Sequence, residues 1–294
     1  MKKGEHHYYV PESSAWPIKT SIGLGLLLVG FANLLHGHKI GHYLFFVGAL
    51  LLIWTMYGWF SEVVKESLTG MHSKQMDRTY RWGMAWFIFS EVMFFGAFFG
   101  ALFYASQLAV PWLGSGETQQ QLWQNFQSHW PLVNNPNPKE FTNPLEYMGW
   151  WPIPFLNTVI LLTSGVTITW AHWGLLKNKR GHLKFGLFLT IALGVTFLLF
   201  QAYEYHEAYQ DLGLTMASGI YGSTFFMLTG FHGMHVTIGT IMLIVILLRT
   251  LKGHFQPNHH FGFEAVAWYW HFVDFVWLGL FVFVYLIPTG PWAS

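Results

Sequence analysis

The sequence predicts an all-α, polytopic membrane protein with seven transmembrane helices, its N-terminus in the cytoplasm and its C-terminus outside. Two observations lead to this fold class. Hydrophobic residues make up 53% of the 294 residues and charged residues only 10%, whereas soluble domains carry about 25% charged residues. Apolar runs of the length that crosses a bilayer, about 20 residues, recur along the whole chain. Seven such runs argue against buried helices of a soluble protein.

The expected spans share this length and apolar character, and they place most Lys and Arg residues on one side of the membrane. They cover residues 16–36, 41–64, 80–107, 151–175, 183–207, 222–248 and 264–287. With the N-terminus inside, only Lys39 and Lys139 of the 15 Lys and Arg residues lie outside. Cytoplasmic loops of membrane proteins carry such an excess of Lys and Arg. We therefore expect residues 1–294 to form a single membrane domain with this orientation.

The longest connection, residues 108–150, falls outside the membrane and has the composition of a loop. It contains Gly114 and Gly116, a Gln run at 119–121 and the segment Asn134-Asn135-Pro136-Asn137-Pro138, which are turn signals. We expect a short surface helix near residues 122–127. A solvated loop is favoured over a partner contact.

The overall composition excludes several functions. The chain has no cysteine, so disulfides, thiolate metal sites and cysteine nucleophiles are ruled out. A net charge of +1 gives no support to a nucleic-acid partner. The polar stretch before the first span ends in no small-residue cleavage site, so no removable signal peptide is expected.

Glu91 is expected about 16 Å inside the membrane, 11 residues from the inner end of the third span. A carboxyl group at that depth must be paired or neutral. Gly96 and Gly100 follow on a face that lets another helix approach closely. A proton-handling or locking carboxyl and a satisfied packing carboxyl both remain open.

His232 and His235 lie at positions i and i+3, which share one face of the sixth span. Both are expected at a height similar to that of Glu91. Because all three groups need partners in hydrocarbon, we expect a Glu91–His235 hydrogen bond, with His232 as the substitute. A metal site is the alternative, but two histidines fall short of the three or four ligands that zinc or copper takes.

The last span repeats this arrangement with His271 and Asp274, and Glu264 lies nearer the cytoplasm. We expect Asp274 to accept a hydrogen bond from the imidazole of His271. A clasp that holds the helix is favoured over a proton relay. Glu204 is expected to pair with Gln201 near the outer end of the fifth span, where water reaches it.

A second polar group is expected at the cytoplasmic ends of the helices. Cations at that level between helices form pockets for anionic lipid headgroups, and tryptophan prefers the same level. The residues are Trp59, Lys65, Glu66, His72, Arg81, Arg249 and Lys252. The alternative is ordinary positive-inside topology.

Long motifs in a fixed order give a resemblance to a known family. They are WPI at 16–18, SEVMFF at 90–95, NTVILLTSGVTITWAHW at 157–173, EY at 204–205, YGSTFFMLTGFHGMH at 221–235 and NHHFGFEAVAWYWHFVDFVW at 258–277. The chain resembles subunit III of cytochrome c oxidase in its bacterial form. The related quinol-oxidase subunits usually have five spans, so the seven spans here favour the cytochrome c type.

The resemblance implies an accessory subunit, without a redox centre of its own, in a proton-pumping oxidase of the bacterial cytoplasmic membrane. Haem and copper would belong to subunits I and II, its partners, and cytochrome c would dock on the complex and not mainly on this chain. The helices would form a V-shaped, two-bundle arrangement with a phospholipid-filled cleft. Trp59, Glu66, His72, Arg81 and Arg249 match the family's lipid-contacting positions.

The resemblance also implies roles in catalysis by the complex. Glu91 matches the family's carbodiimide-reactive carboxyl. The family is thought to sustain proton uptake into subunit I, to protect its active centre during turnover and to guide oxygen.

This sequence departs from the family at three places. Trp173 replaces a second histidine that is usual after WAH. Lys65 stands where many members have arginine, which argues against a bidentate phosphate contact there. The loop 108–150 is longer than in compact members.

Two other classes of protein fit the sequence less well. A histidine-box membrane hydroxylase would use His254, His259, His260, His232 and His235 as metal ligands, but the last two lie near the bilayer middle. A transporter with a carboxylate relay would show inverted repeats or broken helices, and the sequence shows neither.

Overall fold

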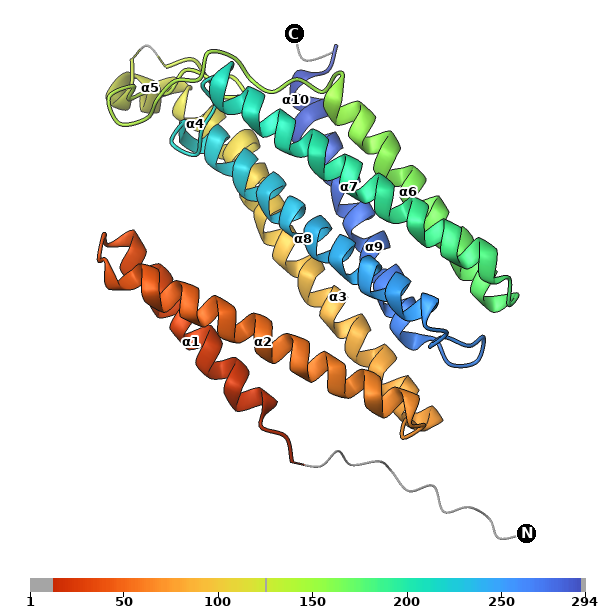
Figure 1. The fold of residues 1–294 in the computed structure, drawn as a ribbon. Helices are drawn as coiled ribbons and strands as arrows, with labels where there is room; N and C mark the ends of the chain where they lie inside the picture. Colours follow the sequence, from red (N-terminus) through yellow and green to blue (C-terminus); the bar gives the residue numbers. More distant parts are fainter. Residues whose placement is uncertain (1–12, 125, 292–294) are drawn as a thin grey trace, which may run out of the picture. The chain divides into compact units, whose positions relative to one another are not determined.

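The computed structural model describes residues 13–124 and 126–291, and this part of the chain is helical without a strand (Figure 1). The α-helices are α1 (Trp16–Leu35), α2 (Ile40–Leu68), α3 (Lys74–Phe103), α4 (Val110–Leu113), α5 (Gly116–Leu122), α6 (Ile153–Leu176), α7 (Arg180–Gln210), α8 (Gly219–Leu251), α9 (Phe261–Leu280) and α10 (Ile287–Thr289). Two π-helical segments, η1 (Tyr104–Ala109) and η2 (Phe281–Leu286), follow α3 and α9. The all-α prediction is confirmed.

Seven helices within the described ranges are long and apolar enough to cross a membrane, as predicted. Their ends differ from the predicted spans by up to six residues. The third runs over Lys74–Leu113, beyond the predicted 80–107, because a helix need not stop where its apolar run stops. Lys2 and Lys3, which the orientation prediction places inside, lie outside the described residues.

Both π-helical segments precede a proline by two residues. η1 ends at Ala109 before Pro111, and η2 ends at Leu286 before Pro288. Proline has no N–H and its ring clashes with the carbonyl four residues earlier. A wider turn accommodates this clash without ending the helix.

The outer loop carries its surface helix earlier than expected. α5 covers Gly116–Leu122, so the prediction of a helix at residues 122–127 was wrong. Trp123 and Phe126 turn toward each other after the helix, with ring centroids 6.2 Å apart. The described residues 123, 124, 126 and 127 are therefore not helical, although a helix was expected there.

The chain divides into two compact units, with the boundary between Trp82 and Gly83. In the first unit, α1 and α2 pack through glycines. A Cβ at Gly41 would lie 2.6 Å from the backbone nitrogen of Leu34, and one at Gly30 or Gly48 would collide with the facing backbone. Small residues of this kind let membrane helices approach closely. The prediction of a single membrane domain is not tested by this division.

The second unit contains the core of large aromatic side chains. Trp270 and Trp277 of α9 are almost completely buried. The Trp270 indole N–H donates to the Ser164 hydroxyl at 2.8 Å, and that of Trp277 donates to the Thr158 hydroxyl at 2.9 Å. Since a buried indole N–H needs a partner, these two hydrogen bonds fix α9 against α6.

The hairpins of the second unit agree with the predicted orientation. The α6–α7 turn and the α8–α9 loop lie at one end of this unit, and η1, α4 and α5 lie at the other (Figure 1). The first end carries Lys177, Lys179, Arg180, Arg249 and Lys252. By the positive-inside rule, this is the end that the orientation prediction places in the cytoplasm.

Candidate functional site

The predicted Glu91–His235 hydrogen bond is present between α3 and α8. The His235 Nε2 and the Glu91 Oε2 lie 2.9 Å apart, and the two side chains are 8% and 20% exposed. The other ring nitrogen, Nδ1, lies 2.6 Å from the carbonyl oxygen of Phe231. Both ring nitrogens thus face an oxygen. A neutral imidazole carries one N–H and can donate to only one of these two oxygens. The second contact is a hydrogen bond only if another proton lies between His235 and Glu91, either on Nε2 or on the carboxyl group.

The surroundings of this pair are aromatic. The ring centroids of Phe94 and Phe95 lie 6.0 and 5.1 Å from that of His235, and Tyr269 stacks on the imidazole at 6.3 Å. Such an apolar shell strengthens a hydrogen bond and makes its loss costly. The arrangement can therefore hold a proton, or lock α3 to α8, within the membrane.

His232 has a different role from that expected as a substitute partner. It is completely buried, and its Nε2 donates to the Val273 carbonyl oxygen at 3.1 Å. The imidazole also packs against Trp277, with ring centroids 5.2 Å apart. His232 therefore joins α8 to α9, whereas His235 joins α8 to α3.

The expected contact between His271 and Asp274 is looser than a hydrogen bond. His271 Nδ1 lies 3.7 Å from Asp274 Oδ2, while its Nε2 lies 3.2 Å from the Thr169 hydroxyl. The Asp274 carboxylate packs directly against Gly165 of α6, where a Cβ would collide with it. The group thus connects α9 with α6, in addition to the expected contact within one helix.

Glu204 differs most from its prediction. It is completely buried, not exposed to water as expected. The hydroxyl group of Tyr285 in η2 donates to Glu204 Oε1 at 2.6 Å. Sequence reasoning missed Tyr285 because its partner lies 81 residues away and on another helix. The only signal was its place one turn before Pro288.

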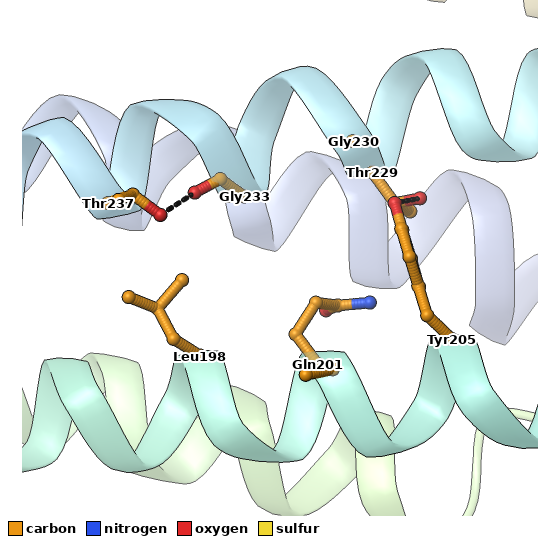
Figure 2. A pocket seen from close by; sticks show the side chains of 8 residues that line it. Leu198, Gln201, Tyr205, Thr229, Gly230, Gly233 and Thr237 are labelled. Atoms are coloured by element: carbon orange, nitrogen blue, oxygen red, sulfur yellow. Dashed lines mark hydrogen bonds between the residues drawn. The ribbon is translucent and has the colours of Figure 1, made fainter.

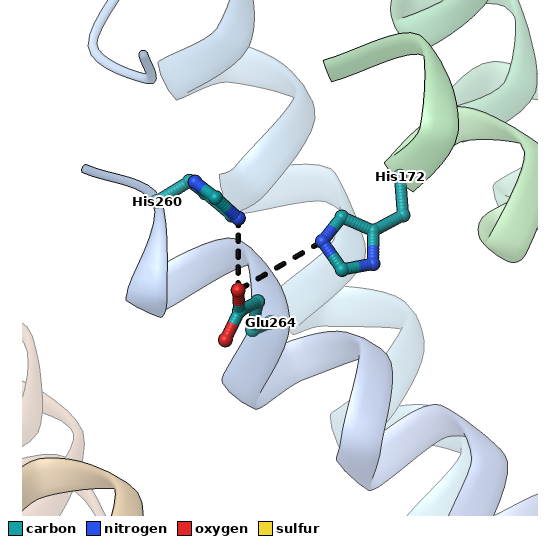
Figure 3. A group of neighbouring side chains, drawn as sticks. All are labelled: His172, His260 and Glu264. Atoms are coloured by element: carbon teal, nitrogen blue, oxygen red, sulfur yellow. Dashed lines mark ion pairs between the residues drawn. The ribbon is translucent and has the colours of Figure 1, made fainter. Parts of the chain in front are cut away.

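One group of potential metal ligands in the described part of the chain was not predicted (Figure 3). It consists of His172 near the end of α6, His260 just before α9, and Glu264 in the first turn of α9. Their ligand atoms all lie within 4.8 Å of one another. Glu264 Oε1 is 2.8 Å from His260 Nε2 and 3.9 Å from His172 Nε2.

This group can hold a positive charge between its members. His260 Nδ1 lies 3.1 Å from the carbonyl oxygen of Gln256, and its Nε2 faces the Glu264 carboxyl group. Because a neutral imidazole has one N–H, the contact between Nε2 and Glu264 requires an additional proton or a divalent cation. Two imidazoles and a carboxylate are a ligand set that transition metals accept. The prediction of no metal rested on His232 and His235 being too few ligands and on the family resemblance, and it remains a prediction.

The predicted lipid-contacting residues of the first unit form pairs at the end of α2 and the start of α3. Trp59 is 41% exposed. His72 Nε2 lies 3.6 Å from Glu66 Oε2, and the Arg81 Nε donates to Asp77 at 2.9 Å. Lys65 is exposed on α2. Sequence reasoning missed Asp77, although its i, i+4 spacing from Arg81 was the signal.

Arg249 and Lys252 belong to the second unit, at the end of α8. The Arg249 guanidinium lies over the Phe255 ring at 4.6 Å from its centroid. Burial, together with the charges of Arg249 and Lys252, lowers the pKa of His254 in the adjacent loop. Burial and the two neighbouring cations therefore disfavour the charged form of His254.

A pocket that the sequence did not indicate lies between α7 and α8 (Figure 2). Its volume is about 230 Å³, and Gln201, Tyr205 and Thr229 give it polar character. The Tyr205 and Thr229 hydroxyls lie 2.7 Å apart. The Gln201 side chain is 5% exposed, and its amide has no hydrogen-bond partner among the described residues.

Comparison with known proteins identifies the family. The family model described as cytochrome c oxidase subunit III matches residues 6–289. The chain belongs to this family. A general role as a subunit of the oxidase, an oxidoreductase complex, follows, and the seven helices make it a multi-pass membrane protein.

Curated relatives cover almost the whole subunit. Cytochrome c oxidase subunit 3 of Drosophila melanogaster is 44% identical over 281 residues, which are 95% of this chain and 96% of the relative. The proteins of the same name from Dugong dugon and Equus caballus are each 44% identical over 286 residues, which are 97% of this chain and 98% of the relative. The resemblance read from the motifs is therefore confirmed.

Proposed function

We propose that this subunit III is an accessory subunit without a redox centre in a proton-pumping cytochrome c oxidase. It binds phospholipid, stabilises subunit I and supports its proton uptake and its stability during turnover. Subunits I and II are its partners and carry the haem and copper, while cytochrome c docks mainly elsewhere on the complex. The oxidase lies in the bacterial cytoplasmic membrane; this last point rests on the sequence resemblance, since the relatives named above are animal proteins.

The Glu91–His235 pair is the observation that best supports this proposal. It is a carboxyl–imidazole pair inside the membrane, shielded by aromatic rings, with an oxygen facing each ring nitrogen. An intramembrane ionisable pair of this kind is costly to keep and indicates function. It suits a subunit that supports proton movement in a neighbouring chain.

The contacts of His232 and His235 argue against a haem or copper site at these two residues. The chain has no cysteine for a thiolate ligand. His232 is bound to the Val273 carbonyl and His235 to Glu91, so neither is oriented toward a shared ligand centre. This also argues against the hydroxylase alternative, which requires these histidines as ligands.

The visible spectrum of the complex, purified through a tag on this chain, tests the proposal. A haem spectrum together with two larger partner subunits is the expected result. Copper content and the oxidation of reduced cytochrome c then distinguish this oxidase from a quinol oxidase. A colourless protein with one equivalent or more of iron would refute the proposal in favour of the hydroxylase.

A further inference from the structure

The cytoplasmic end of the α6–α7 hairpin contains a cavity of about 300 Å³. It is lined by Trp170, Trp173, Gly174, Lys177, Lys179 and His182. None of these residues belongs to the proposed lipid set of Trp59, Lys65, Glu66, His72, Arg81, Arg249 and Lys252. The cavity lies within the second unit, so its walls are defined by one compact body.

The turn between the two helices holds these walls in place. Three backbone hydrogen bonds close this turn. The N–H of Lys177 donates to the carbonyl oxygen of Trp173, that of Asn178 to Leu175, and that of Lys179 to Gly174 at 2.7 Å. A Cβ at Gly174 would lie 2.8 Å from the backbone nitrogen of Leu183. The two lysines therefore stand on either side of a tight turn, with little freedom in the backbone beneath them.

The cavity is strongly positive. The sequence contains no acidic residue between Glu146 and Glu204, whereas Lys177, Lys179 and Arg180 fall within four positions. No carboxylate lines the cavity. Arg180 beside it has a buried Nη1 without a hydrogen-bond partner in the described part of the chain. These charges favour an anion that comes from outside the chain.

The aromatic walls fit the membrane interface. The Trp170 ring stacks on His182 with centroids 5.0 Å apart and an angle of 26°. Trp173 is 58% exposed. Tryptophan rings prefer the headgroup level, with the polar edge toward water and the apolar body toward acyl chains. One wall of the cavity can thus contact lipid glycerol and chains while the lysines contact phosphate.

We propose that this cavity binds the phosphate headgroup of an anionic phospholipid of the cytoplasmic leaflet. The two lysines hold the phosphate, and Trp173 covers the glycerol region. The proposal depends on the cytoplasmic placement of the hairpin, and not on the lipid set proposed above, so either can fail alone.

The test uses the purified oxidase complex in nanodiscs of phosphatidylcholine, titrated with phosphatidylglycerol and analysed by mass spectrometry for bound lipid. The variant Lys177→Ala/Lys179→Ala removes the phosphate contacts, and Trp173→His restores the usual family residue. The matched control, Lys74→Ala/Lys184→Ala, removes two cytoplasmic lysines that do not line the cavity.

We expect one bound phosphatidylglycerol to be lost in the double cavity variant, with an affinity about 30-fold lower, because each lysine near the lipid surface contributes about 1 kcal/mol. Trp173→His should show a smaller loss, and the control should behave as the wild type. Equal lipid counts in all proteins, or an equal loss in the control, would overturn the proposal.

Two further measurements distinguish lipid from free phosphate and provide a test if the double variant does not assemble. Excess inorganic phosphate at constant ionic strength should leave the lipid bound; displacement would show that the cavity takes free phosphate and would overturn the lipid assignment. If the double variant does not assemble, Lys179→Ala alone is titrated against Lys184→Ala. The same loss from both single variants would overturn the proposal.

Discussion

Breaking the Glu91–His235 pair gives the most direct test of its structural role. The changes are Glu91→Leu, His235→Leu and the two together. The atoms lie 2.9 Å apart and both side chains are largely shielded. Either single change leaves the other polar group without its partner, which costs about 1–3 kcal/mol. The double variant removes both groups, so we expect an interaction energy of about 1–2 kcal/mol.

The assay is the loss of this chain from the purified oxidase as dodecyl sulfate is increased, with the midpoints converted to relative free energies. The two single variants should be destabilised to a similar extent. A control cycle combines Glu91→Leu with Tyr285→Phe, which share no hydrogen-bond partner, and it should be additive within about 0.5 kcal/mol. If the Glu91–His235 cycle is equally additive, the pair does not stabilise the chain and the reasoning is refuted.

Three more predictions concern activity, lipid and the outer end of the bundle. Glu91→Gln should leave electron transfer nearly intact, because the residue holds no redox centre; loss of most oxidase turnover with normal assembly would contradict this. Replacing Arg81 and Arg249 with alanine should lower the phospholipid phosphorus per complex and speed inactivation during turnover, and unchanged phosphorus would count against it. Tyr285→Phe should destabilise the chain by about 1–3 kcal/mol, because buried Glu204 loses its hydrogen bond; dodecyl sulfate midpoints like those of the wild type would show that Glu204 finds another partner.

The polar contacts of the bundle show which pairs a sequence can predict. Glu91 and His235 could be paired because both lie at similar height in hydrocarbon, where each needs a partner. Glu204 could not be paired with Tyr285 in the same way. A tyrosine in a membrane helix is uncharged and does not demand a charged partner as a carboxylate does. Its position in the sequence therefore does not indicate that it bonds to Glu204.

The His172–His260–Glu264 group shows a second limit. His260 and Glu264 are one helical turn apart and are visible in the sequence, but His172 lies 88 positions earlier than His260. The three meet only because α6 packs against α9, where the Trp270 and Trp277 indoles bond to Ser164 and Thr158. A pairwise packing contact of this kind fixes how far each helix is rotated about its axis, and the local sequence does not.

By itself, the sequence determined the number of membrane helices and the family, and it predicted their orientation, since length, hydropathy, charge asymmetry and long motifs are local properties of the chain. Only the tertiary structure decided that Glu204 is buried under Tyr285, that His232 and His235 serve different helices, and that two lysines and two tryptophans enclose one cavity. The physical reason is that the rotation and approach of helices in a membrane depend on close packing of small and aromatic side chains across the bundle.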